Sequence, residues 1–158
     1  MHTNHPQESS TESSTEAKAE TLIRATGARL TQPRIRVLSF LLAQQRALTH
    51  HDVLAALPGD KLDAVTLYRV LEWLVEQGIA HRIEGADHVW RFSANPAEGA
   101  HGSHGHAHFH CTRCAAVTCM SGMPLPARMK LPEGFISEEV SLLIKGTCPQ
   151  CADDGAPR

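Results

Sequence analysis

The residues with the clearest chemical potential are cysteines gathered in the C-terminal third of the chain. Four of the five cysteines form two Cys-x-x-Cys pairs, Cys111 with Cys114 and Cys148 with Cys151. Each pair can supply two corners of a tetrahedron to one zinc ion. Disulfide bonds or redox dithiols are the alternative, but an odd number of cysteines and the lack of an apolar signal-peptide region favour metal. We therefore expect one structural zinc site made of these four thiolates.

A run of histidines directly precedes the first cysteine pair. Five of the eleven histidines fall between positions 101 and 110, and the fifth cysteine, Cys119, follows closely. No acidic residue lies between Glu98 and Cys119, and imidazoles with one thiolate suit zinc better than Mn²⁺, which prefers oxygen donors. A loose metal-scavenging segment is the alternative to a built site. We expect at least one regulatory zinc site here, beside the structural one, in each protomer.

Length and composition limit the class of protein. A chain of 158 residues fits one or two small domains, and aromatic residues make up only 4% of it. Because large rings are scarce, a metal staple would add needed stability. No apolar stretch is long enough to cross a bilayer, and cysteines reserved for metal suit a reducing compartment. We expect a cytoplasmic protein with no membrane partner.

Positive charge is concentrated in one part of the chain, although the formal net charge is only −2. Residues 22–48 hold five arginines and no acidic residue. A block of this kind is typical of a solvated helix face or of a nucleic-acid contact, and the charge pattern alone leaves both open.

Helices are expected in the N-terminal half. Residues 1–16, rich in Ser, Thr and Glu, should form a disordered arm, and a first helix should span residues 17–26. A second helix should begin around Pro33, because proline is tolerated in a first helical turn.

The third and fourth helices have clear capping signals. Thr49 and Asp52 have the spacing of a capping box, and Asp63 can cap a helix that ends at Gly78. The fourth helix also has the strongest amphipathic pattern, with buried positions expected at Leu67, Val70, Leu71, Leu74 and Val75.

After the fourth helix the apolar period changes to two. Residues 79–84 and 88–92 alternate in polarity around the turn Gly85-Ala86-Asp87, which predicts a β-hairpin. Helices followed by a hairpin in this order predict a winged helix-turn-helix, with the hairpin as its wing.

The C-terminal half is expected to contain short strands. Residues 109–111, 116–119 and 135–145 have strand-like patterns, and one short helix could lie between residues 123 and 132. About 55 residues with few large apolar groups make a weak core, so zinc and a second copy of the chain should complete it. We therefore predict a homodimer.

Together these patterns predict an α+β protein of two domains. An N-terminal winged helix-turn-helix domain should span residues 17–93, and a small C-terminal α/β dimerisation domain, stapled by the four-cysteine zinc site, should span residues 106–152. Residues 94–105 should form the hinge between them, and residues 153–158 a polar tail.

Several motifs in this order resemble a known family. They are T-Q-P-R at 31–34, A-V-T-L-Y-R-V-L at 64–71, E-Q-G-I at 76–79, H-x-H-F-H-C-x-x-C at 106–114 and C-P-x-C at 148–151. This combination resembles the ferric uptake regulator family of metal-responsive repressors, over roughly residues 17–152, and looks most like its zinc uptake regulators. The resemblance implies a winged-helix DNA reader, a dimerisation domain and a sensory metal at the hinge.

The resemblance also implies roles for individual residues. The four paired cysteines match the family's structural zinc ligands. His81 and His104 match sensory ligands of the zinc branch, whereas His106 and His108 match ligands of the iron and peroxide branches. Cys119 stands where many relatives place Glu or Asp.

Departures from the family pattern leave the sensory ligand set open. Ala47 stands where iron and peroxide sensors often supply a histidine, and Val140 stands at the strand histidine of the family's auxiliary site. Near the wing's second ligand of the zinc branch, Arg91 and Phe92 offer no metal donor. The candidates are His81, His88, His101, His104, His106, His108, His110 and Cys119.

For DNA, the resemblance matches Tyr68 and Arg69 to the recognition-helix pair that meets bases or backbone. Thr66 and Arg34 are expected on phosphate. The alternatives are packing against a neighbouring helix for Tyr68 and plain solvation for Arg34.

The sequence therefore predicts a zinc-responsive transcriptional repressor that binds double-stranded operator DNA as a homodimer and controls zinc uptake genes. One ion would clamp the wing, the linker and the dimerisation domain. A sibling sensor for iron, manganese, nickel or peroxide is one alternative, and a zinc-storage protein or metallochaperone is another. An enzyme is not expected, because the H-x-E motif of zinc deaminases is missing, and neither is a small organic substrate.

Overall fold

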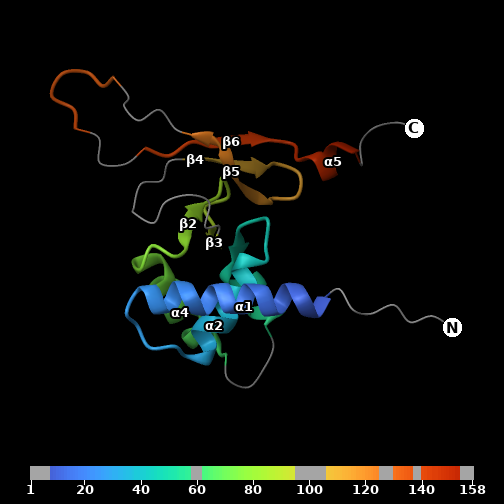
Figure 1. Cartoon of the computed structure of the whole chain (residues 1–158). Coiled ribbons are helices and arrows are strands. Elements are labelled where there is room, and N and C mark those ends of the chain that lie inside the picture. The colour runs from blue at the N-terminus through green and yellow to red at the C-terminus, as the bar shows by residue number, and fades with distance from the viewer. Residues whose placement is uncertain (1–7, 58–61, 95–105, 125–129, 137–139, 154–158) are drawn as a thin grey trace.

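In the computed structural model, helices and a small sheet form the N-terminal half, and a second sheet and one short helix form the regular part of the C-terminal half (Figure 1). The structure describes residues 8–57, 62–94, 106–124, 130–136 and 140–153. This mixed organisation agrees with the predicted fold class. None of the described helices is both long and apolar enough to cross a membrane.

The first helix, α1 (Glu8–Ala25), begins earlier than expected. Residues 8–16, predicted to belong to a disordered arm, are helical, whereas residues 1–7 lie outside the described part of the chain. Further along, Ala19 and Ile23 are completely buried and join α1 to the core.

The other three N-terminal helices begin where Pro33, in the first turn of the second helix, and the capping residues of the third and fourth predicted. They are α2 (Gln32–Leu42), α3 (His50–Ala56) and α4 (Ala64–Glu76). Thr49 and Asp52 form the predicted capping box at α3, and Asp63 accepts a hydrogen bond of 2.7 Å from the backbone N–H of Thr66 at α4. The predicted apolar face of α4 is confirmed, since Leu67, Val70, Leu71 and Leu74 are buried in the N-terminal core and Val75 packs against it.

The wing is a small antiparallel sheet of β1 (Leu48–Thr49), β2 (His81–Glu84) and β3 (Trp90–Ser93), in the order β1-β3-β2. Its turn is closed by a hydrogen bond of 3.0 Å from His88 N–H to the carbonyl of Gly85. Arg91 stabilises the turn, because its guanidinium donates to both carboxylate oxygens of Asp87 at 2.8 and 2.7 Å. The hairpin was predicted, but the added strand β1 was not.

The C-terminal sheet contains β4 (His106–Cys111), β5 (Val117–Pro124) and β6 (Leu143–Gly146), in the order β5-β4-β6, and α5 (Pro149–Asp153) follows it. Strand β4 pairs with β5 antiparallel and with β6 parallel. The predicted strand over residues 135–145 is wrong in its extent, because its described part before Leu143 is irregular. The short helix expected between residues 123 and 132 falls mostly on residues 125–129, outside the described chain.

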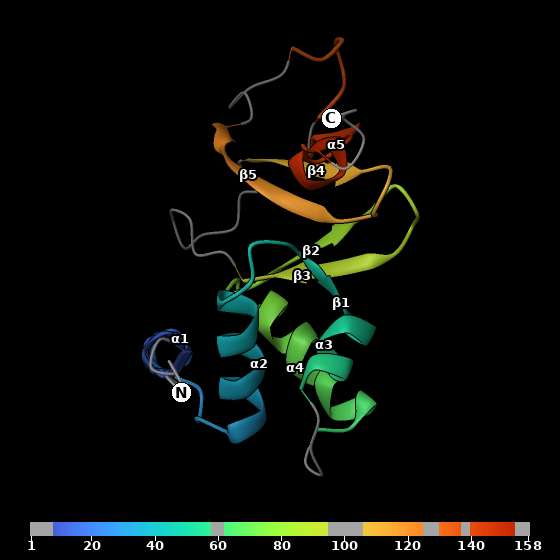
Figure 2. The ribbon, with the colours of Figure 1, turned by 90° about the vertical axis from the view of Figure 1, so that its right-hand side faces the viewer.

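The two halves meet where the wing lies against the C-terminal sheet (Figure 2). The backbone N–H of Ala47 donates to the carbonyl of Val117 at 2.8 Å, and Ala47, Ile83 and Val117 form a small buried apolar cluster across the boundary. Cys119 packs against this cluster. The boundary between wing and sheet is therefore a packed seam, and it positions the histidines described next.

Candidate metal centres

Four cysteine sulfurs converge at one end of the C-terminal sheet. Cys111 ends β4, Cys114 follows in the turn, and Cys148 and Cys151 bracket the start of α5. All four sulfurs lie within 4.8 Å of one another, and those of Cys114 and Cys148 are 3.8 Å apart. A tetrahedral zinc ion with Zn–S bonds of about 2.3 Å requires sulfurs about 3.8 Å apart. The donor set and its spacing therefore fit the structural zinc predicted from the sequence.

The electrostatics of this cluster also suit a cation. Backbone N–H groups of Cys114 and Cys148 point at the buried sulfur of Cys111 and lower the pKa of its thiol to about 6. The neighbouring sulfurs, first that of Cys148, raise the pKa of Cys151 to about 12. Crowded thiolates repel one another, so four of them are stable together only when a bound dication offsets their charge.

A second cluster lies at the seam between the two halves. It contains His81 of β2, His108 of β4 and Cys119 of β5. The His81 Nε2 atom lies 3.3 Å from Cys119 Sγ and 3.4 Å from His108 Nε2. Ligands of one tetrahedral zinc, with Zn–N bonds of about 2.0 to 2.1 Å, are separated by similar distances. Three protein donors around one point can therefore hold a zinc ion and leave one position for a further ligand.

Strand register explains why these three side chains meet. His108 and Cys119 are direct cross-strand partners in the β4–β5 pair, so both project from the same face of the sheet. His81 is the first residue of β2 and faces them from the wing. His81 and Cys119 are far apart in the sequence and match no short-range motif. They come together only because the wing packs on the C-terminal sheet.

The thiol of Cys119 is in a different environment from that of Cys111. Burial raises its pKa, and its Sγ atom lies 3.6 Å from the hydroxyl oxygen of Ser93. Ser93 is buried, and it pairs across the wing with His81. Ser93 was not among the site residues predicted from the sequence, although alternation along β3 places it on the same face as Arg91, two residues earlier. A hydroxyl here can donate to a thiolate and orient it.

The remaining candidate histidines have other positions. His88 is exposed at the wing turn and bonded to Glu84 at 2.9 Å, so it points away from the cluster. His110 is buried, and its Nδ1 atom accepts a hydrogen bond from the wing turn. His106 lies in β4 without a described side chain, and residues 101 and 104 lie outside the described chain, which leaves their predicted ligand roles as predictions.

The candidate DNA-contact residues lie mainly on the first turns of α4. Tyr68 is 54% exposed and Arg69 is also exposed. His50 of α3 supports this end of the helix, because its Nε2 atom lies 3.0 Å from the carbonyl oxygen of Ala64 and its ring contacts that of Tyr68.

Arg34, predicted to contact phosphate, makes contacts within its own domain. Its guanidinium lies 3.8 Å from the centre of the Trp73 ring and donates to the carbonyl of Arg29 at 3.0 Å. It would have to leave these partners to reach DNA, so a structural role competes with the predicted one.

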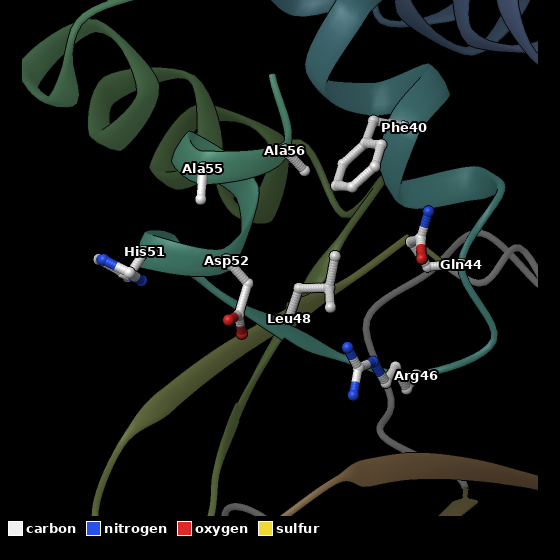
Figure 3. Close-up of a pocket in the computed structure, with 8 residues that line it drawn as sticks. All are labelled: Phe40, Gln44, Arg46, Leu48, His51, Asp52, Ala55 and Ala56. Atoms are coloured by element: carbon white, nitrogen blue, oxygen red, sulfur yellow. The ribbon is translucent and has the colours of Figure 1, made fainter. Parts of the chain in front are cut away.

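A shallow pocket of about 390 Å³ lies between α2, β1 and α3 (Figure 3). Its lining mixes apolar and charged side chains: Phe40, Gln44, Arg46, Leu48, His51, Asp52, Ala55 and Ala56. Asp52 is already engaged by Thr49 in the capping box of α3. In the described part of the chain, only the two clusters above gather three or more potential metal ligands closely, and this pocket contains neither.

Comparison with known proteins identifies related sequences. The profile of the ferric uptake regulator family matches residues 25–131. The zinc uptake regulation protein of Escherichia coli (strain K12) is 30% identical over 153 residues, covering 90% of this chain and 84% of that protein. Transcriptional regulator FurA of Mycobacterium tuberculosis (strain H37Rv) is 30% identical over 136 residues, covering 82% and 87%.

Solved structures agree on the fold. A zinc uptake regulator complexed with zinc and DNA matches with a TM-score of 0.66 at 24% identity, covering 93% of this chain and 99% of that one. The structure of holo XcZur matches with a TM-score of 0.58 at 20% identity, covering 90% and 99%. These likenesses confirm the predicted fold class.

Proposed function

Because the chain belongs to the ferric uptake regulator family of metal-responsive transcription regulators, we propose that it is a repressor that responds to zinc. In this proposal it binds double-stranded operator DNA as a homodimer when its regulatory site is loaded, and it controls genes of zinc uptake and homeostasis. The observation that carries the proposal is the cluster of His81, His108 and Cys119, whose members come from both halves of the chain.

The donor atoms of this cluster favour zinc. Two imidazoles and one thiolate suit a borderline-soft ion, whereas Mn²⁺ prefers carboxylates and water. The similarity, at 24% identity, to the peroxide-responsive repressor PerR of Staphylococcus aureus keeps peroxide as a rival effector, and iron, manganese and nickel are the other rivals predicted from the sequence. The partly buried sulfur of Cys119 supports zinc over these rivals. A zinc store or metallochaperone would leave the exposed start of α4 without a role.

The position of the cluster suggests how the switch works. A bound Zn²⁺ would supply the charge and coordination that hold the three side chains at one point. His81 is part of the wing, while His108 and Cys119 are part of the C-terminal sheet. Holding them together fixes the wing against the sheet and selects one arrangement of the two halves. We infer that this arrangement is the one that fits DNA.

In the homodimer, two copies of α4 would enter successive major grooves, about 34 to 36 Å apart. The exposed apolar side chains of Phe135 and Ile136, 69% and 91% exposed, suit burial against a second copy of the chain. Tyr68 and Arg69 would contact bases or backbone, Thr66 would contact phosphate, and Arg34 would do so only by leaving Trp73.

An operator-binding titration tests the proposal. Wild-type protein with its structural zinc retained is titrated onto upstream DNA of a zinc importer gene, with and without added zinc, and in parallel with Mn²⁺, Fe²⁺, Ni²⁺ and peroxide. Zinc should raise affinity by about 5- to 150-fold, the usual range of allosteric coupling. His81→Ala should abolish the gain, and His88→Ala, in the same wing but outside the cluster, should keep it. DNA affinity that ignores zinc while the structural site stays filled contradicts the proposal.

Arg69→Ala tests the recognition helix separately. The variant should lose about 1 to 3 kcal/mol of operator binding if Arg69 reads a guanine, with less loss on random DNA. An identical loss on both DNAs would place Arg69 on phosphate.

A further inference from the structure

His110 occupies the seam without belonging to either metal cluster. It is only 5% exposed, and its Nδ1 atom accepts a hydrogen bond of 3.0 Å from the backbone N–H of Ala86. The acceptor lies on β4 of the C-terminal sheet, and the donor lies in the turn of the wing. This bond therefore joins the two halves of the chain at the tip of the wing.

The chemistry of the contact defines the state of the ring. Because Nδ1 accepts a hydrogen bond it must carry a lone pair, so the ring proton lies on Nε2. That Nε2 atom is buried and has no hydrogen-bond partner among the described residues. Only one nitrogen of this buried ring is hydrogen-bonded, so its polar contribution to stability comes from that single bond. The bond also gives the backbone N–H of Ala86 a partner that it would otherwise lack.

The wing turn is held in place by contacts within the wing, so a bond to its backbone also fixes the position of the wing tip. Asp87 is held by both nitrogens of the buried Arg91 guanidinium. Gly85 admits this guanidinium closely, since a Cβ atom at that position would collide with an Arg91 nitrogen. Ala86 lies between Gly85 and Asp87, so the direction of its N–H is determined by a well-packed turn.

The bond also continues a series of contacts that begins at the second metal cluster. Along β4 and β5, His108 pairs with Cys119 and His110 pairs with Val117, so all four project toward the wing. Along the wing, His81 meets the first pair, Ile83 packs against Val117, and Ala86 meets His110. The cluster lies at one end of the seam and the His110 bond at the other, with an apolar contact between them.

We propose that His110 is a positioning residue that fixes the wing turn on the C-terminal sheet, so that closure of the seam at the neighbouring His81, His108 and Cys119 cluster sets the position of the wing tip on DNA. The DNA part of this inference rests on the proposed function. The contact itself does not, and it can be measured without DNA.

Substitutions on both sides of the bond test it. His110→Asn keeps an acceptor oxygen close to the position of Nδ1, whereas His110→Leu removes the acceptor with an apolar side chain. Ala86→Pro removes the donor from the other side, at the second position of a turn that is closed by the His88 to Gly85 hydrogen bond, where proline is favoured. His88→Ala is the control, because it removes a histidine of the same turn that does not touch the sheet.

In zinc-loaded protein, amide exchange at Ala86 should be slow in wild type and His110→Asn and at least about tenfold faster in His110→Leu. Operator affinity should fall about fivefold in His110→Leu and Ala86→Pro, as for loss of one net hydrogen bond, and stay within about twofold in His110→Asn and His88→Ala. The double variant His110→Leu/Ala86→Pro should lose no more than either single variant, because both remove the same bond.

Additive losses in the double variant, or equal behaviour of His110→Leu and His110→Asn, would overturn the inference. Zinc content is measured for every variant, and if His110→Leu disturbs the adjacent Cys111, Ala86→Pro decides the question from the wing side. A wild-type protein that binds DNA without regard to zinc would defeat the proposed function instead, while the exchange rate at Ala86 would still report on the contact.

Discussion

The two metal clusters use similar donors but come from different parts of the chain. The sulfurs of Cys111, Cys114, Cys148 and Cys151 all come from the C-terminal half, whereas the cluster of His81, His108 and Cys119 includes a residue of the wing. An ion in the first cluster stabilises the C-terminal half regardless of the position of the N-terminal half. An ion in the second cluster is held fully only when the two halves are together, and the proposed function therefore assigns the switch to the second cluster.

Two cysteines, Cys111 of the first cluster and Cys119 of the second, also differ in their readiness to bind metal. Backbone N–H groups lower the pKa of Cys111 to about 6, so its thiolate is available at neutral pH. Burial raises the pKa of Cys119, so its proton must leave when metal arrives. Within the first cluster, the neighbouring sulfurs raise the pKa of Cys151 to about 12, so both clusters must release protons when metal binds.

The largest expected effect follows from breaking the first cluster. Cys148→Ser should remove the structural zinc and unfold the C-terminal sheet, because structural zinc sites contribute about 10 to 16 kcal/mol, more than the roughly 3 to 5 kcal/mol that a small core supplies. Zinc analysis together with circular dichroism checks this. A folded, zinc-depleted sheet would show that the clusters do not differ in the way described above.

Removing the thiolate of the second cluster should have a large effect on zinc affinity and little effect on folding. Cys119→Ser should weaken the regulatory zinc by more than about 100-fold, beyond the 10- to 100-fold usual for outer-shell partners, and leave the structural zinc in place. Chelator competition at constant pH measures both ions. Unchanged retention of two zinc ions would exclude Cys119 as a ligand.

A smaller effect is expected in the wing, which contributes His81 to the second cluster. Arg91 lowers the pKa of Asp87 far below its ordinary value, and Asp87→Asn would leave the buried Arg91 cation without its charged partner. Because Asp87 is partly exposed, we expect a loss of about 1 to 2 kcal/mol in the free energy of unfolding at pH 7. Since the folded pKa is the lower one, this contribution is present above about pH 4 and is lost as the pH falls further.

Urea unfolding followed by tryptophan fluorescence measures this loss, because both tryptophans, Trp73 and Trp90, belong to the N-terminal half. Glu84→Gln, which removes the exposed pair with His88, is the matched control and should change stability by less than about 1 kcal/mol. Zinc affinity should fall at the second cluster only. Equal weakening of the four-cysteine site would contradict the separation of the two clusters.

The smallest effect is expected at Ser93. Its hydroxyl lies beside the Cys119 sulfur, and Ser93→Ala should weaken the regulatory zinc by about tenfold, at the low end for an outer-shell partner. The structural zinc should not change. The same chelator competition checks this, and full wild-type affinity would mean that the hydroxyl only fills space.

Much of the molecule could be predicted from the sequence wherever the interactions are local. The capping box at Thr49, the Asp63 cap, the apolar face of α4 and the wing hairpin all depend on residues a few positions apart. The four-cysteine cluster was also predictable, because a Cys-x-x-Cys turn places two sulfurs together and two such turns complete a tetrahedron.

Predictions were less successful where the local structure depends on contacts between segments that are far apart in the sequence. Contacts with distant neighbours determine three features that were not predicted. These are the irregular residues before β6, the strand β1, and the stacking of Arg34 on Trp73. The start of α1 also differs from the prediction, because composition suggested disorder for residues 8–16, which are helical.

The sequence by itself determined that this chain has two kinds of metal donor and a winged-helix half, since residue type and short spacing suffice for both. Only the tertiary structure decided which histidine faces His81 and that His110 meets the wing turn instead of the metal cluster. The physical reason is strand register together with the packing of the wing on the sheet. These determine which of several similar imidazoles project toward one point, and no short-range pattern in the chain encodes that choice.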